Sequence, residues 1–160
     1  MSRGESTSQF NFSEDLRVVL ARARRESTSL RHDYVGVEHI LVALIAHTPS
    51  RGSDLLAQLG VEPDRIAATV RETVRAGTKT DARPDNPYTT RAKKVLELSM
   101  QLSHFLRNDD VNSTHLLGGI IAERQSIAGC ILADAGVTLE QALPLIARAN
   151  DTALPTEPWT

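Results

Sequence analysis

An internal repeat at a constant spacing of 76 positions constrains this chain more than any other feature. The stretch His32–Ile45, HDYVGVEHILVALI, recurs as Asn108–Ile121, NDDVNSTHLLGGII, and the alignment of residues 12–74 with 88–150 needs no gap. About a quarter of the paired positions are identical. A constant offset over two whole halves indicates a duplicated structural unit. We therefore look for function where the halves meet and where they differ.

Apolar residues recur at helical spacing in both halves, which predicts an all-α fold. The chain is rich in aliphatic residues, and only 4% of its residues are aromatic, which suits packed helices better than a β-sandwich. Ser13 and Thr138 have the features of helix N-caps, and Pro144 predicts that the last helix is kinked or starts late. We expect the later helices to span residues 37–46, 54–59, 62–76, 89–105, 113–122, 126–135 and 138–149.

Composition along the chain predicts one compact domain between two tails. Residues 1–9 are rich in Ser, Gly and Glu and are expected to form a flexible N-terminal tail. The domain covers residues 10–150, with repeat one at 12–76, a linker at 77–87 and repeat two at 88–150; residues 151–160 form a C-terminal tail. The linker GTKTDARPDNP has two prolines and no large apolar residue.

Charge and composition exclude several classes of protein. A net charge of −2 argues against a nucleic-acid binder, which needs clustered positive charge. The sequence has neither a signal peptide nor a long apolar segment, so we expect no membrane partner. Because the single cysteine, Cys130, cannot form an internal disulfide, we expect a cytoplasmic protein. We also expect a monomer.

No pattern of residues predicts an enzyme. The G-x-x-x-x-G-K-[ST] motif of P-loop ATPases is absent, and no spacing of Ser, His and Asp singles out a catalytic triad. His39 and His115 occupy equivalent positions on apolar helices, which favours a structural role as buried, hydrogen-bonded histidines over metal binding. Cys130 lies among apolar residues and is expected in the core. We expect no catalytic residue, no metal and no cofactor.

Three segments resemble the Clp N-terminal (Clp repeat) domain family, and its ClpC branch in particular. Phe12-Ser13-Glu14 resembles the family's F-[ST]-E opening, and the segment 34–41, YVGVEHIL, resembles its Y-[IV]-G-[TS]-E-H-[LI]-L core. The segment 87–99, PYTTRAKKVLELS, is similar to the start of the second repeat in ClpC-type unfoldases. The resemblance covers about residues 10–149 and includes the duplication.

The resemblance implies a fold of two pseudo-twofold-related four-helix repeats packed as one compact domain. It also implies a non-catalytic module that docks substrates or adaptors for a Clp unfoldase and its protease, with a protein or peptide as partner. The alternative is a decoy that sequesters cyclic peptide antibiotics aimed at the unfoldase. The tail PTEPWT and the start of the chain favour a stand-alone protein over an excised domain.

Members of the ClpC branch recognise phosphorylated arginine, and the resemblance implies two incomplete sites of this kind. We expect each site to combine the N-terminus of the first helix of a repeat with the residue before the core histidine. The first half has Ser13 and Glu38, but Asp15 replaces an arginine that is usual in the family. The second half has Thr89 and Arg91, but Thr114 replaces the glutamate. Weak binding at both sites is therefore expected.

A second candidate surface is apolar and is implied by the same resemblance. Phe10, Phe12 and Tyr88 precede the first helices of the two repeats, so the pseudo-twofold axis is expected to bring them to the boundary between halves. Lys93 would add positive charge there. The family binds adaptors and some cyclic peptide antibiotics in this region. The competing interpretation is that Phe12 and Tyr88 only pack against the start of their own helices.

Overall fold

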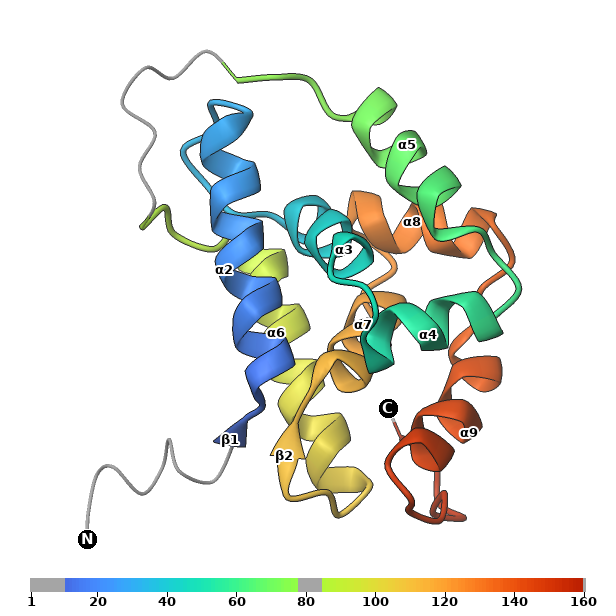
Figure 1. Cartoon of the computed structure of the whole chain (residues 1–160). Helices are drawn as coiled ribbons and strands as arrows, with labels where there is room; N and C mark the ends of the chain where they lie inside the picture. Colours follow the sequence, from blue (N-terminus) through green and yellow to red (C-terminus); the bar gives the residue numbers. More distant parts are fainter. Residues whose placement is uncertain (1–10, 78–84, 160) are drawn as a thin grey trace, which may run out of the picture.

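The computed structural model describes residues 11–77 and 85–159, and these form an all-α fold (Figure 1). Each helix of the first half has a counterpart in the second half whose bounds are shifted by the same 76 positions. The first half contains α2 (Glu14–Ser29), α3 (Val37–Ala46), α4 (Arg51–Gln58) and α5 (Pro63–Thr73). The second contains α6 (Thr90–Phe105), α7 (Ser113–Ala122), α8 (Ile127–Asp134) and α9 (Leu139–Ala149). The prediction of two four-helix repeats is confirmed.

Local sequence signals set most helix ends. The side chain of Ser13 accepts a hydrogen bond from the backbone N–H of Leu16, and Thr138 forms a capping box with Gln141, as the sequence predicts. The late start expected for the last helix is wrong, because α9 begins directly after Thr138 and contains Pro144. The helix expected to reach residue 76 ends at Thr73 instead.

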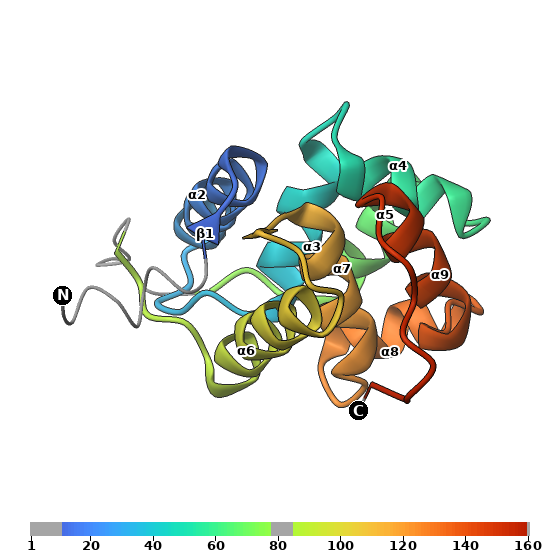
Figure 2. The same cartoon turned by 90° about the horizontal axis from the view of Figure 1, so that it is seen from below.

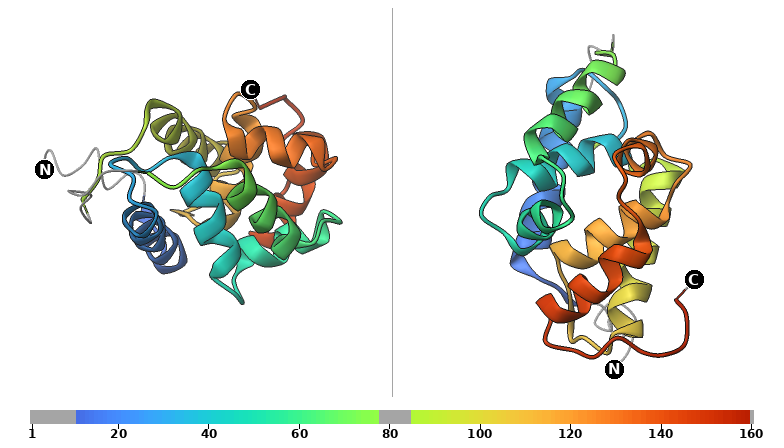
Figure 3. Two further views of the ribbon diagram at one scale, coloured as in Figure 1. Left: turned by 90° about the horizontal axis from the view of Figure 1, so that it is seen from above. Right: turned by 90° about the vertical axis from the view of Figure 1, so that its right-hand side faces the viewer.

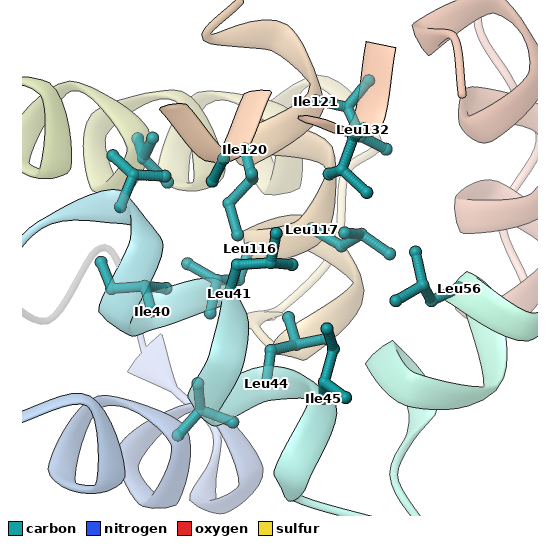
Figure 4. Close-up of a cluster of buried hydrophobic side chains, with 14 of the residues drawn as sticks. Ile40, Leu41, Leu44, Ile45, Leu56, Leu116, Leu117, Ile120, Ile121 and Leu132 are labelled. Atoms are coloured by element: carbon teal, nitrogen blue, oxygen red, sulfur yellow. The ribbon is translucent and has the colours of Figure 1, made fainter. Parts of the chain in front are cut away.

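The core lies between α3 and α7, which cross at the centre of the molecule with the other helices around them (Figure 3). Nearly every side chain of these two helices is buried. Leu41 and Leu44 of α3 face Leu116 and Leu117 of α7 (Figure 4). The halves also interlock at the outside, since α4 packs against α7 and α9, and α5 packs against α8 (Figure 1).

Two adjacent glycines bring α6 and α7 close together. A Cβ atom at Gly119 would lie 2.7 Å from both Ser99 Oγ and the carbonyl oxygen of Val95, and one at Gly118 would lie 2.5 Å from a methyl group of Leu102. A side chain larger than hydrogen at either position would therefore push the helices apart. This tight contact fixes α6 against the centre of the fold.

Short parallel strand pairs cross between the halves and obey the pseudo-twofold symmetry. Strand β1 (Asn11–Phe12) pairs with β2 (Asp110–Val111), so that Phe12 lies opposite Val111. The equivalent pair in the other direction is the bridge between Tyr88 and Val35. Each repeat therefore starts by pairing with the segment that precedes the second helix of the other repeat, which is α7 for the first repeat and α3 for the second.

Contacts at both ends of the linker tie it to the C-terminal end of α2. The N–H of Gly77 donates to the carbonyl of Leu30 at 2.7 Å, and Asn86 Nδ2 donates to Ser27 Oγ and to the carbonyl of His32, each at 2.8 Å. These contacts explain why α5 ends early, since residues 74–77 leave the helix to reach α2.

Among the described residues, no single helix is both long and apolar enough to cross a membrane. Only α7 and α8 together contain enough apolar residues, and they meet at an angle of 87°.

Candidate binding site at the boundary between the halves

The boundary between the halves has two ends, and one of them joins the N-termini of α3 and α6. The N–H of Thr89 donates to the carbonyl of Val35 at 2.9 Å, and the Thr89 side chain caps α6 by accepting from the N–H of Ala92. Gly36, next to Val35, is the N-cap of α3, and Glu38 lies in the first turn of that helix. We refer to this region as the α3–α6 end.

The opposite end joins the N-termini of α2 and α7. The N–H of Ser13 donates to the carbonyl of Val111 at 2.9 Å, directly before Asn112, the N-cap of α7. Ser113 and Thr114 are the first two residues of α7, so Thr114 matches Glu38 in position. We refer to this region as the α2–α7 end.

The expected pairing of site residues within each half is wrong. Ser27 Oγ donates to the carbonyl of Tyr34, so the C-terminal end of α2 lies beside the segment that leads into α3. Ser13 lies at the other end of α2, a distance of roughly 20 Å at 1.5 Å per helical residue. Glu38 is therefore near Thr89, and Ser13 is near Thr114. A repeat pattern cannot distinguish pairing within a half from pairing across halves.

The α3–α6 end keeps all three groups that the resemblance implies. Arg91 is exposed in the first turn of α6, where its Nη1 lies 3.0 Å from Gln125 Oε1 and 3.6 Å from Glu123 Oε1. The Glu38 carboxylate turns back over Gly36, where a Cβ atom would lie 2.5 Å from its Oε1. Within the described chain, no ion pair or hydrogen bond joins Glu38 to Thr89 or Arg91, so a ligand that used Arg91 would compete only with Glu123 and Gln125 for its guanidinium.

Tyr88 completes this end with an aromatic surface. The guanidinium carbon of Arg24, on α2, lies 4.6 Å from the centre of the Tyr88 ring, a cation–π distance. Burial raises the pKa of the Tyr88 hydroxyl, although the nearby Arg24 charge acts in the opposite direction. Arg24 Nε is buried and has no hydrogen-bond partner among the described residues. Sequence reasoning missed Arg24, because an arginine on a helix rich in arginine carries no distinguishing signal.

The aromatic residues do not form one cluster. Phe12 is partly buried against the core at the α2–α7 end, whereas Tyr88 contacts α2 at Arg24, about three turns further along that helix. Phe10 lies outside the described residues. Phe12 and Tyr88 find no apolar partner in the fourth residue of the helix that each precedes, because these residues are Arg17 and the exposed Lys93.

The α2–α7 end is filled by the protein's own side chains. The Asp15 carboxylate accepts hydrogen bonds from Ser13 Oγ and, at 2.6 Å, from Ser113 Oγ, which in turn accepts from the N–H of Gly52 at 2.8 Å. Thr114 is fully buried, and its Oγ1 donates to Asn112 at 2.6 Å. The N-termini of α2, α4 and α7 are thus connected through the carboxylate of Asp15.

His39 and His115 are buried, and each holds the first turn of its helix. Nδ1 of His39 accepts from the N–H of Gly36 at 2.8 Å, and Nδ1 of His115 accepts from the N–H of Asn112 at 3.0 Å. Burial lowers the pKa of each imidazole to about 4, so both rings are neutral near pH 7. His39 therefore fixes the turn that carries Glu38.

The described residues contain no group of three or more His, Cys, Asp or Glu side chains placed to hold a metal ion. The expectation that Cys130 lies in the core is wrong, because its side chain is exposed on α8 with Sγ 3.1 Å from the carbonyl of Arg124. Ala128 and Leu132 face the core from another side of the helix, whereas Ile127 is exposed like Cys130.

Comparisons with known proteins agree with this architecture. The family model of the Clp repeat (R) N-terminal domain matches residues 11–135 and 87–153. The ClpC/MecB protein of Bacillus subtilis, described as a negative regulator of genetic competence, is 34% identical over 131 residues, which are 82% of this chain and 16% of that protein. A ClpC ATP-binding subunit of Staphylococcus aureus is 30% identical over the same shares.

Solved structures show the same fold at low identity. The N-terminal domain of ClpD from Arabidopsis thaliana has a TM-score of 0.67 at 20% identity and covers 86% of this chain and 96% of its own. The ClpV N-domain in complex with a VipB peptide has a TM-score of 0.70 at 16% identity and covers 96% of each chain. On the family match and the ClpC relatives, this chain belongs to the Clp repeat N-terminal domain family and resembles its ClpC-type members.

Proposed function

We propose that this chain is a non-catalytic peptide-binding module of a Clp unfoldase–protease system, and that it docks substrates or adaptors at the α3–α6 end. The supporting observation is that the cross-half bridge between Val35 and Tyr88 brings Glu38, Thr89 and Arg91 to one end of the boundary. The ClpV N-domain bound to a VipB peptide supports the view that this fold accepts peptides.

The chemistry of this end suits a side chain that carries both charges. Backbone N–H groups in the first turn of α6, together with Arg91, favour an anion such as phosphate. Glu38 can accept hydrogen bonds from a guanidinium, and the Tyr88 ring offers an apolar wall. In a phosphorylated arginine, the anionic phosphate would meet Arg91 and the N-terminus of α6, and the guanidinium would meet Glu38.

The two ends differ in what they offer such a ligand. At the α2–α7 end, Asp15 places a negative charge where phosphate would bind, and Thr114 provides no carboxylate. One phospho-arginine site per chain is therefore expected, instead of two equally weak ones.

Calorimetric titration of a phospho-arginine peptide tests this function. We expect one site per chain, and we expect Arg91→Gln and Glu38→Gln each to weaken binding by roughly one to two decades, since a charged hydrogen bond contributes about 1.5–3 kcal/mol. The matched controls are Arg65→Gln and Glu62→Gln, which remove an exposed pair on and beside α5 with an N–O distance of 3.8 Å. These controls should bind like the wild type.

Two equal sites per chain, or unchanged binding in Arg91→Gln, would show that the α3–α6 end is not the docking site. A parallel titration with a cyclic peptide antibiotic tests the alternative decoy function. That alternative predicts tight antibiotic binding that survives Arg91→Gln, with no binding of Clp substrate peptides.

A further inference from the structure

The chain after α9 folds back along that helix as a strap without regular secondary structure (Figure 2). The N–H of Thr152 donates to the carbonyl of Ala147 at 2.9 Å and so reverses the chain direction. Beyond Thr152, no hydrogen bond joins residues 153–159 to the rest of the described chain. Most side chains of this stretch are exposed, including Leu154. The strap is therefore held at its far end by something other than polar contacts.

Trp159 provides that contact. It is the only tryptophan in the sequence, is partly buried, and packs against the hydrophobic core. It forms one side of a groove of about 590 Å³ lined by α6, by the α7–α8 connection and by the start of α9. Leu98 of α6 and Leu139 of α9 are among the apolar lining residues. The groove is far larger than one side chain needs, so the strap does not fill it.

The first half contains a groove at the corresponding junction of α3 and α5, although no residue of α2 lines it. That groove has a volume of about 460 Å³. Four pairs of lining residues occupy equivalent positions in the two repeats: Ile45 and Ile121, Ala46 and Ala122, Thr48 and Arg124, and Pro63 and Leu139. Among the described residues, a strap residue lines only the second-half groove.

The two grooves differ in charge, since Asp64 and Arg71 line the first and Lys94, Glu123 and Arg124 line the second. Arg124 lines the second-half groove, where the first half has Thr48. Glu123 is paired with Arg91, whereas Arg124 makes no ion pair within the part of the chain that the structure describes. Glu157 precedes Trp159 by two residues in the strap. An acidic segment that ends in an aromatic residue therefore complements this groove.

From these contacts we propose that the strap is a displaceable internal ligand, and that the groove beside Trp159 binds an acidic, proline-flanked aromatic segment of a partner protein in its place. A single aromatic contact at the end of a polar strap must offset the entropy of closing the loop, so the docked and released states are close in free energy. The groove adjoins the α3–α6 end, because Glu123 and Gln125, which both contact Arg91, also line the groove.

The fluorescence of Trp159 in the intact chain reports the docked state directly. We expect wild-type emission to be shifted to shorter wavelength, and to be less sensitive to acrylamide, than the emission of the free peptide ALPTEPW. Titration with ALPTEPF, which lacks tryptophan, should displace Trp159 and shift its emission toward that of the free peptide. ALPTEPA should cause no shift, and ALPTKPF should bind about two- to fivefold more weakly because it lacks the acid.

A substitution taken from the other repeat provides a variant that the fold already accommodates. Arg22 occupies the position equivalent to Leu98 in the first half, so Leu98→Arg should fold normally, as checked by circular dichroism, while it releases Trp159 and abolishes the response to ALPTEPF. Arg124→Gln should remove the difference between ALPTEPF and ALPTKPF. Solvent-like emission in the wild type, or emission that ALPTEPF does not change, would overturn the proposal.

Discussion

Nδ1 of His32 lies 2.8 Å from Nε2 of His39, and this buried pair links three segments of the first half. Because the N–H of Gly36 donates to His39 Nδ1, the proton of the neutral His39 ring is on Nε2 and points at His32. His32 Nε2 then donates to the carbonyl of Arg75 at 2.8 Å. In the second half Asn108 replaces His32, and its Oδ1 lies 2.6 Å from His115 Nε2.

Exchanging the two arrangements tests this assignment of protons. In His32→Asn, the new amide oxygen should accept from His39 as Asn108 does from His115, so only the bond to Arg75 is lost. We expect a loss in unfolding free energy of about 1 kcal/mol, against about 2–4 kcal/mol for His32→Ala, which also leaves a cavity and an unpaired His39. Urea denaturation measures both values. Equal losses in the two variants would contradict the assignment.

Acid should destabilise the protein through the same histidines. Both pKa values are near 4 in the folded state and near 6.5 in the unfolded state, so between these limits the unfolded chain binds more protons. The contribution of these histidines to the unfolding free energy is therefore fully present above pH 6.5 and decreases as the pH falls. Below about pH 4 it is lost, which amounts to up to roughly 3 kcal/mol per histidine. Denaturation at several pH values, with NMR titration of the imidazoles, measures this. His39→Gln should remove part of the slope.

The duplication explains why so much of the fold could be predicted. Helical periodicity and caps at Ser13 and Thr138 located the helices, and the ungapped repeat required the halves to share a structure. The errors arose where tertiary contacts override local signals. Residues 74–77 leave α5 because His32 and Leu30 hold their backbone. Pro144 lies inside α9, where Ala142, Ile146 and Ala147 on either side of it are buried in the core.

The candidate site was harder to predict, because periodicity identifies equivalent residues and says nothing about which of them meet. The cross-half bridge between Val35 and Tyr88 decides that Glu38 belongs with Arg91. The position of Asp15 was identified from the sequence, but the role of its carboxylate depends on Ser113, 98 positions away. Similarly, nothing in the strap sequence indicates that Trp159 lies beside the start of α9.

Gly119 should not tolerate a side chain. In Gly119→Ala the new methyl group would approach Ser99 Oγ and the Val95 carbonyl, and we expect a loss of about 1–3 kcal/mol despite the higher helix propensity of alanine. Thermal or urea denaturation measures this loss. The control is Ala43→Gly at the equivalent position in the first half, where a propensity cost of about 1 kcal/mol and the loss of one buried methyl group, about 0.8 kcal/mol, are expected. A stabilised Gly119→Ala variant would show that α6 and α7 can separate freely.

The hydrogen bond between Ser113 and Asp15 should couple the two halves energetically. A double-mutant cycle of Asp15→Asn and Ser113→Ala isolates this interaction, because each single substitution removes the charged hydrogen bond. We expect a coupling free energy of about 1.5–3 kcal/mol, the range for a hydrogen bond to an ionised group. A coupling near zero would mean that Asp15 is solvated and does not join the halves. If the coupling is present, Asp15→Arg cannot simply rebuild a second phosphate site, because it removes the contact that holds α2 against α7.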